Sequence, residues 1–241
     1  MKIAFFWPRR ILLATLILLS IAWTYEEASQ WLFRYRAEKL LAESRALEVN
    51  QSSLSEAQAL LQRWSRYGTT LSRCNGDLCR SSFFIRQFLP GAFRGAPTEG
   101  AWNLLPRLVD HIGLRNEVVG IGFTTESGIV TQKDFGLSVA LPVEDWFLRG
   151  GAYVPDLAVS TSEAAKFSDY EQRYVLPPHP FSMVRNQKGP YGMLVTFKPE
   201  EDASEQAALM NFQFSCLTKF FPCRSEGEIL PKGWEMLKER Q

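Results

Sequence analysis

Histidine is scarce in this sequence, since among 241 residues only His111 and His179 occur. His111 follows Asp110 late in an expected short helix, where a histidine caps carbonyl groups or faces solvent. His179 lies in a proline-rich segment that is expected to be rigid and extended, without a second ligand nearby in the sequence. We therefore predict no metal site. Either histidine is a candidate general base only if the fold brings it close to the other histidine or to another residue that is distant in the sequence.

Known catalytic and ligand-binding motifs are also missing. The pair Gly120 and Gly122 lacks the third glycine and the following helix of a dinucleotide-binding fingerprint. No G-x-S-x-G, H-E-x-x-H, P-loop, S-x-x-K or EF-hand pattern occurs. Four carboxylates are candidates for an acid–base pair, although their spacing singles out no two of them: Asp134, Asp145, Asp156 and Glu171. We predict no catalytic or cofactor-binding residue and no cofactor, and the sequence favours a protein that is not an enzyme.

An excess of one charge is absent as well. The 27 basic and 26 acidic residues give a formal net charge of +1. Lys2, Arg9 and Arg10 are the only charges among the first 25 residues, so the rest holds 24 basic and 26 acidic groups, a charge of −2. A nucleic-acid-binding surface needs a basic excess, so no nucleic-acid partner is expected. The acidic run from Glu200 to Asp202 precedes an expected helix, whose dipole it complements, which favours a helix start over a metal site.

Cysteine is limited to two close pairs, Cys74 with Cys79 and Cys216 with Cys223. In an exported chain such pairs favour disulfides, and Asn75-Gly76 is a turn signal between the first two. Each local bridge contributes about 2 kcal/mol by chain entropy, and one long crosslink would contribute about 5 kcal/mol. Four cysteines allow three connectivities, of which we predict the local one, with a four-cysteine zinc site as the alternative.

One long apolar run is present, from Ile11 to Trp23. Residues 11–25 would rise about 22 Å as a helix, against a hydrocarbon core of about 30 Å. Snorkelling of Arg9 and Arg10 and an interfacial Trp23 and Tyr25 can make up the difference. The run predicts a single-pass transmembrane signal anchor. A cleaved signal peptide with a site near Ala22 and an ordinary buried helix are the alternatives.

The flanking charges predict the orientation of such an anchor. Arg9 and Arg10 precede the run, and no basic residue follows it before Arg34. The positive-inside rule then places residues 1–10 in the cytoplasm and the rest of the chain outside it. Because no cysteine precedes Cys74, a lipid-modified cysteine near the start is excluded. We expect a membrane protein whose main domain is extracytoplasmic.

A helix is expected from Tyr25 to about Leu47, with one apolar face formed by Phe33, Ala37, Leu40, Leu41 and Leu47. This face either packs on the chain's own domain or pairs with a helix of another protein. A second helix should begin with the capping box of Ser53 and Glu56, carry Leu54, Ala57, Leu61 and Trp64 inward, and end at Gly68. We assign residues 26–68 to a helical stalk and helical hairpin.

After Gly68 the spacing of the apolar residues changes from a helical period to the alternation of a strand. Residues 78–88 are expected to be extended, and a strand pair with Val119, Ile121 and Phe123 on its first strand should turn at 126–128. The second strand should present these residues on one face: Ile129, Thr131, Phe135, Leu137, Val139 and Leu141. Residues 182–186 and 193–197 predict another hairpin. Helices are expected at 102–112, 200–220 and 231–239, and a central loop region includes residues 150–162.

Helices at both ends with antiparallel hairpins between them predict an α+β fold, with residues 69–241 as an extracytoplasmic α+β domain. Aromatic residues in or near expected loops are candidates for a recognition surface: Trp146, Phe147, Tyr153 and Tyr191.

Both ends of the chain carry a resemblance. The segments from Asn211 to Thr218 and from Glu228 to Trp234, with Cys223 between them, resemble the ending of an uncharacterised bacterial family of small anchored proteins. The start is similar too, with an arginine-flanked apolar segment, a charged helix, a Ser-x-x-Glu helix and a close cysteine pair. This resemblance implies an exported, disulfide-bonded domain on a helical stalk, and it implies no activity and no functional residues.

Three functions are compatible with this sequence. We favour a binding or scaffolding module at the cell envelope, which should expose an apolar or aromatic patch of several hundred Å². The alternative is an envelope hydrolase that uses scattered carboxylates with His111 or His179, which should show a pocket where such groups converge. The third is an accessory subunit of a membrane complex, docked on another envelope protein through an uncovered Phe33–Leu47 face.

Overall fold

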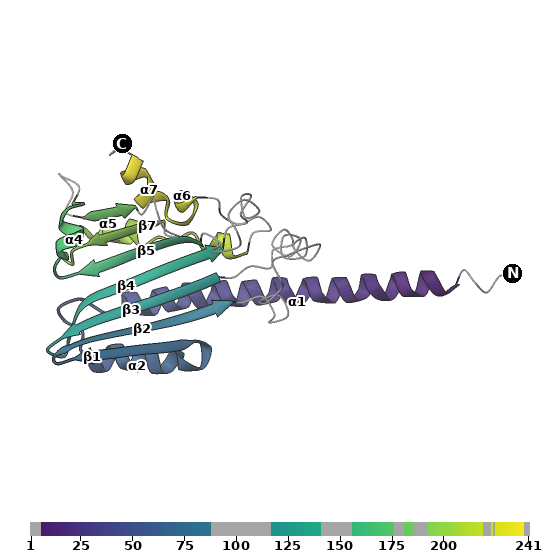
Figure 1. Cartoon of the computed structure of the whole chain (residues 1–241), viewed down its shortest axis with the longest axis horizontal. Coiled ribbons are helices and arrows are strands. Elements are labelled where there is room, and N and C mark those ends of the chain that lie inside the picture. The colour runs from purple at the N-terminus through teal and green to yellow at the C-terminus, as the bar shows by residue number, and fades with distance from the viewer. Residues whose placement is uncertain are drawn as a thin grey trace, which may run out of the picture.

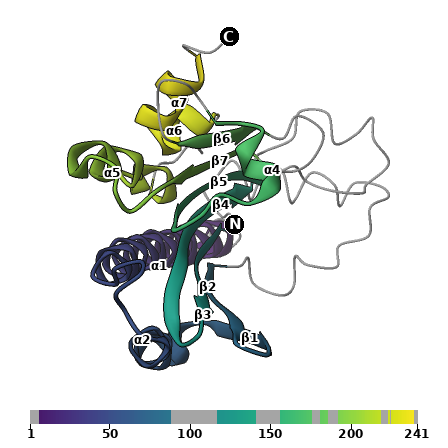
Figure 2. The same ribbon diagram turned by 90° about the vertical axis from the view of Figure 1, so that its left-hand side faces the viewer.

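The computed structural model describes residues 6–87, 117–140, 156–175, 181–185, 192–218, 223 and 225–238. Several predictions fall outside these residues: His111, His179, Asp145, the helix at 102–112, Leu141 and the four loop aromatics. The described part is an α+β fold in which a seven-stranded sheet carries helices on one face (Figures 1 and 2).

The sheet has the strand order β1-β2-β3-β4-β5-β7-β6. All neighbours are antiparallel except β5 and β7, which pair in parallel. The strands are β1 (Thr69–Asn75), β2 (Leu78–Gln87), β3 (Glu117–Glu126), β4 (Ile129–Ala140), β5 (Asp156–Ala164), β6 (Ser182–Arg185) and β7 (Met193–Phe197). The expected hairpins at β3–β4 and β6–β7 are therefore confirmed, and the expected turn at Asn75-Gly76 joins β1 to β2.

The helices are α1 (Phe6–Arg45), α2 (Leu54–Trp64), α4 (Asp169–Gln172), α5 (Ala203–Leu209), α6 (Glu226–Ile229) and α7 (Pro231–Lys238). Two 3-10 turns complete them, η1 (Ser65–Tyr67) and η5 (Phe214–Leu217). Figure 2 shows α1, α2 and α5 on one side of the sheet and α4 on the other. The expected helix at 200–220 was too long, because the chain leaves the helical conformation after Leu209 and forms only the short turn η5 afterwards.

Helix α1 is continuous over 40 residues, about 60 Å. Its second half buries Phe33, Ala37, Leu40 and Leu41 in the main core, together with residues of the sheet. Its first half is exposed, with side chains from Ile11 to Tyr25 between 45% and 75% accessible among the large apolar residues. The expected apolar face is thus covered by the chain's own domain, and it is not available for another protein.

Helix α2 confirms the capping box. Ser53 donates its backbone N–H to Glu56 Oε2 at 2.7 Å, and the Glu56 N–H donates to Ser53 Oγ at 3.3 Å. Ala57, Leu60, Leu61 and Trp64 are buried against the core. Gly68 lies so close to β2 that a Cβ there would be 2.2 Å from the Phe84 carbonyl oxygen, which requires glycine at this position.

Strand β4 differs from its expected pattern at the start. The register between β3 and β4 shifts at Thr124 and Thr125, as in a β-bulge. The shift reverses the alternation at the first residues of β4, so Val130 is fully buried while Ile129 is 45% exposed. The expectation that Ile129 and Thr131 share a face with Phe135 was therefore wrong, because one extra residue on a strand moves its side chains to the other face.

Strand β5 lies inside the region expected to be a loop, and this expectation was wrong as well. Asp156–Ala164 pairs with β4 over nine residues and with β7 on its other side. Leu157 and Val159 are the only large apolar residues of this strand, and both are buried. Ser160 and Ser162 are small and polar, so the sequence of the strand is only weakly apolar. Pairing with β4 and β7, together with the burial of Leu157 and Val159, holds this segment in the sheet.

A buried ion pair ties the end of α1 to the sheet. Lys133 Nζ on β4 lies 2.8 Å from Glu163 Oε2 on β5, and the same nitrogen donates to the Leu47 carbonyl at 2.6 Å. Both side chains are buried. The pair therefore fixes the chain after α1 against the centre of the sheet.

Candidate functional site: a hollow on the open face of the sheet

The two faces of the sheet differ in side-chain size. The face toward α1 carries the large core residues, including Phe83, Ile121, Phe135 and Val195. The opposite face carries mainly small residues on its three central strands, and all of them except the buried Ser162 are only partly buried: Gly120 and Gly122 on β3, Gly136 and Ser138 on β4, and Ala158, Ser160 and Ser162 on β5. Small side chains leave the sheet backbone close to the surface, and a hollow forms above it.

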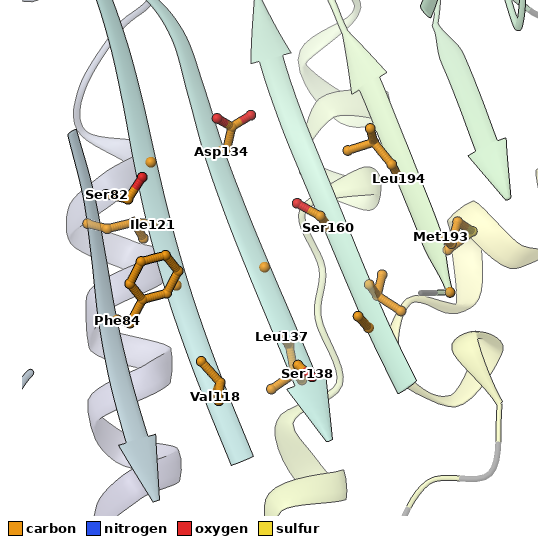
Figure 3. Close-up of a pocket in the computed structure, with 16 residues that line it drawn as sticks. Ser82, Phe84, Val118, Ile121, Asp134, Leu137, Ser138, Ser160, Met193 and Leu194 are labelled. Carbon is orange, nitrogen blue, oxygen red and sulfur yellow. The ribbon is translucent and has the colours of Figure 1, made fainter. Parts of the chain in front are cut away.

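The hollow has a volume of about 520 Å³ and is lined by β2, β3, β4, β5 and β7 (Figure 3). Gly120 and Gly136 form its floor. A Cβ at Gly120 would be 2.8 Å from the ring of Phe84, so the glycine lets this ring lie across β3. A Cβ at Gly136 would meet its nearest neighbour, Ser160 Oγ, at 3.5 Å, which is an ordinary contact. Among the described residues, Gly136 thus has space above it for a side chain.

The strand register arranges the open face in rows that cross the sheet. One row is polar and consists of Ser82, Gly122, Asp134, Ser162, Thr196 and Ser182. The next row is apolar or small and consists of Phe84, Gly120, Gly136, Ser160, Leu194 and Val184. A third row continues with Arg86, Val118, Ser138 and Ala158. The hollow spans parts of all three rows, so its polarity changes along the strands.

Asp134 is the acidic residue among those that line the hollow. It accepts a hydrogen bond from Gln132 Nε2 at 2.9 Å, and the same nitrogen donates to Ser162 Oγ at 3.0 Å. Burial raises the pKa of the Asp134 carboxyl above its usual value of 3.8, and the charge of Glu171 acts in the same direction. Hydrogen bonds from Ser162 and Gln132 and the charge of Arg80 oppose this rise of the pKa. The hollow therefore presents an acid whose charged form is disfavoured.

Glu171 lies on α4 beside the polar row and is buried. Its carboxylate accepts hydrogen bonds from the Ser168 backbone N–H at 2.8 Å, the Ser168 hydroxyl at 2.6 Å and the Thr196 hydroxyl at 2.5 Å. Its backbone carbonyl accepts from the Ser182 hydroxyl at 2.6 Å. These contacts indicate a structural role, in which Glu171 fastens α4 to β6 and β7.

The structure thus brings together two of the four carboxylates considered in the sequence, Asp134 and Glu171, on the same side of the sheet. Asp156 begins β5, and Asp145 lies outside the described residues with both histidines. Within the described ranges, no group of three His, Cys, Asp or Glu side chains is placed to hold a metal ion. Asp202, from the acidic run, is the N-cap of α5 and accepts from the Ser204 and Glu205 N–H groups.

The first predicted cysteine pair is joined at the tip of the β1–β2 hairpin, where Cys74 and Cys79 are directly opposite each other. Gly76 in the turn has a positive φ of 59°, as the turn signal predicts. Cys223 is disulfide-bonded and fully buried in the core. Its predicted pairing with Cys216 lies outside the described side chains.

Sequence reasoning missed the hollow, although a signal was present. Small residues recur at every second position in three short segments: Gly120 and Gly122 on β3, Gly136 and Ser138 on β4, and Ala158, Ser160 and Ser162 on β5. Taken singly, these residues indicate weak strands or loops. Only their alignment across neighbouring strands turns them into one depression.

Comparisons of the chain with protein-family models, with curated proteins and with solved structures found no match. The function has to be inferred from the geometry of the hollow and from helix α1.

Proposed function

We propose that this protein is a single-pass membrane-anchored binding protein, whose domain binds a small, mainly apolar ligand in the hollow of the open sheet face outside the cytoplasm. The observation that carries the proposal is the hollow itself. Its volume lies within the range of about 300–1,000 Å³ that is typical of small-molecule sites. Its wall is mostly apolar, as in such sites, and its polar side chains are Ser82 and Asp134 at one end with Ser160 and Ser138 farther along the strands.

The membrane anchor is supported by the first half of α1. This part of the helix is apolar and long enough to cross a bilayer, and none of its apolar window is buried by the domain. Arg9 and Arg10 before the window favour a cytoplasmic N-terminus. The bridge between Cys74 and Cys79 fits an oxidising compartment.

Binding is favoured over hydrolysis by the state of the two carboxylates that the structure brings together, Asp134 and Glu171. Asp134 faces the hollow, but Glu171 is occupied by Ser168 and Thr196, so it is poorly suited to act on a bound substrate. The hydrolase alternative stays a prediction because His111 and His179 lie outside the described residues.

The test fills the hollow from its floor. Replacing Gly136 by Leu places a side chain above β4, where a Cβ meets no atom of the described residues closer than 3.5 Å. We expect the uncharged fluorescent apolar probe Nile red to bind the unaltered protein and to bind Gly136→Leu roughly tenfold more weakly. The matched control is Thr124→Leu, on the same face but outside the hollow, which should leave probe binding unchanged.

Circular dichroism should show the same folded state for both variants. Equal probe binding by the unaltered protein and Gly136→Leu would refute the hollow as a binding site.

A further inference from the structure

Helix α1 runs along the strands of the sheet (Figure 1). Its direction therefore shows which end of the hollow lies nearer to the apolar N-terminal segment. Gln87, at the end of β2, donates to Glu26 Oε1 at 3.5 Å and to Ser29 Oγ at 3.4 Å. At the other end of the sheet, Lys133 reaches the Leu47 carbonyl. The end of the sheet at Gln87 is therefore adjacent to the end of the apolar segment at Tyr25.

The rows of the open face can be placed along this axis by counting from Gln87. At about 3.3 Å for each residue of a strand, the row of Arg86 is about 3 Å from that end, the row of Phe84 about 10 Å, and the row of Ser82 about 17 Å. The apolar part of the hollow, with Phe84, Val118 and Leu194, thus lies nearer to the apolar segment. The polar row with Asp134 lies farther from it.

An amphiphile in the adjacent membrane leaflet has the same order of polarity, with its hydrocarbon chain toward the bilayer and its polar end away from it. We propose, resting on the function proposed above, that the hollow receives the hydrocarbon chain of a membrane amphiphile, whose hydroxyl- or amine-bearing end contacts Asp134. Such a molecule enters without reversing its orientation. The chain lies over Gly136 and beside the ring of Phe84, where the described residues leave the floor clear.

The polar row also sets the chemistry of the head. The Asp134 carboxyl accepts a hydrogen bond from a hydroxyl or an ammonium group, and the hydroxyls of Ser82 and Ser162 lie beside it in the row. An anionic sulfate or phosphate would meet a carboxylate of the same sign. We therefore expect discrimination between amphiphiles of equal chain length according to the charge of the head.

The experiment uses the full chain reconstituted in phosphatidylethanolamine–phosphatidylglycerol vesicles that contain a long-chain alcohol with a diazirine in the middle of its chain. After illumination, mass spectrometry should find the label in residues 117–140 and 156–164 as well as in residues 11–25. In Gly136→Leu the label in the sheet should fall roughly tenfold, while the label in residues 11–25 persists as an internal control. Thr124→Leu should keep both.

A second variant, Ser160→Leu, fills the hollow from β5 and should give the same loss, so a folding defect in one variant does not decide the result. A long-chain amine should compete with the labelled alcohol, and a long-chain sulfate of equal length should not. Asp134→Asn should reduce this difference between the two competitors.

Label confined to residues 11–25 in the unaltered protein would overturn the inference. If Nile red still binds and Gly136→Leu weakens that binding, the function proposed above stands and only the membrane origin of the ligand fails. If neither Nile red nor the alcohol reaches the hollow, both proposals fail.

Discussion

At the scale of single residues, Asp134 combines two properties that rarely serve stability. It faces a hollow, and its hydrogen bonds to Gln132 and Ser162 do not offset the burial of its charge. A charged group that the fold disfavours is often retained for binding or chemistry rather than for packing. Asp134 is therefore the residue whose replacement should separate stability from ligand recognition.

We predict that Asp134→Asn removes a pH-dependent part of the stability. Because the pKa of Asp134 is raised in the folded protein, the folded state binds the proton more tightly than the unfolded state. The pKa of an aspartate in the unfolded chain is about 3.9. As the pH rises from this value through the higher pKa of the folded protein, ionisation of Asp134 lowers the free energy of unfolding. Above the folded pKa this loss of stability stays constant. Denaturant titrations between pH 3 and 8 should show a shallower decline for Asp134→Asn. The control is Glu126→Gln, which changes an exposed carboxylate.

The ion pair of Lys133 and Glu163 gives a second prediction at this scale. Lys133→Ala should lower the free energy of unfolding by about 3–5 kcal/mol, because it leaves the Glu163 carboxylate buried without a partner. The double variant Lys133→Met with Glu163→Leu should recover most of this loss, since an apolar pair avoids the desolvation of both charges. Urea unfolding monitored by tryptophan fluorescence measures both. A double variant as unstable as Lys133→Ala would show that the contact to Leu47, and not the pair, matters most.

At the scale of elements, helix α2 depends on a local signal that needs no tertiary contact. Its capping box satisfies N–H groups that the first turn of a helix leaves unpaired. The Ser53 backbone N–H also holds the pKa of Glu56 below its usual value of 4.5, so the stabilisation from this carboxylate is present above pH 4.5 and declines as the pH falls through the lowered pKa.

We therefore predict that Ser53→Ala lowers the free energy of unfolding by about 1 kcal/mol. The control variant Gln58→Ala, on the exposed face of the same helix, should leave stability unchanged or slightly higher, because alanine is a strong helix former. Thermal unfolding followed by circular dichroism compares the two variants. An equal effect of both replacements would mean that the cap contributes nothing measurable.

At the scale of the whole molecule, the proposed arrangement has the domain directly beside the bilayer. Helix α1 continues without a break from its exposed apolar half into the half that packs on the sheet. The face of this half that carries Phe33, Ala37, Leu40 and Leu41 is therefore part of the domain's core. Motion of the domain relative to an anchored α1 should be small.

The orientation gives the fourth prediction. A reporter enzyme that is active only after disulfide formation outside the cytoplasm should be active when fused to the C-terminus. Replacing Arg9 and Arg10 by Glu should reduce this activity, because it removes the charges that hold the N-terminus inside. Activity only of a reporter that requires the cytoplasm would contradict the proposed topology.

The sequence by itself predicted the elements whose signals are local. The capping box of Ser53 and Glu56, the turn at Gly76 and the apolar face of Phe33 to Leu41 depend on contacts within a few residues or on a helical period. Such patterns are visible along the chain because the residues that satisfy them are neighbours in it. The α+β class follows from their order.

Only the tertiary structure decided the phase of β4, the presence of β5 and the existence of the hollow. The bulge at Thr124 is set by pairing between strands, and β5 is held by β4 and β7 on its two sides. Gly120, Gly136 and Ser160 come from three strands and become one floor only through their register. A cavity is a property of residues that are distant in sequence, so no local pattern specifies it.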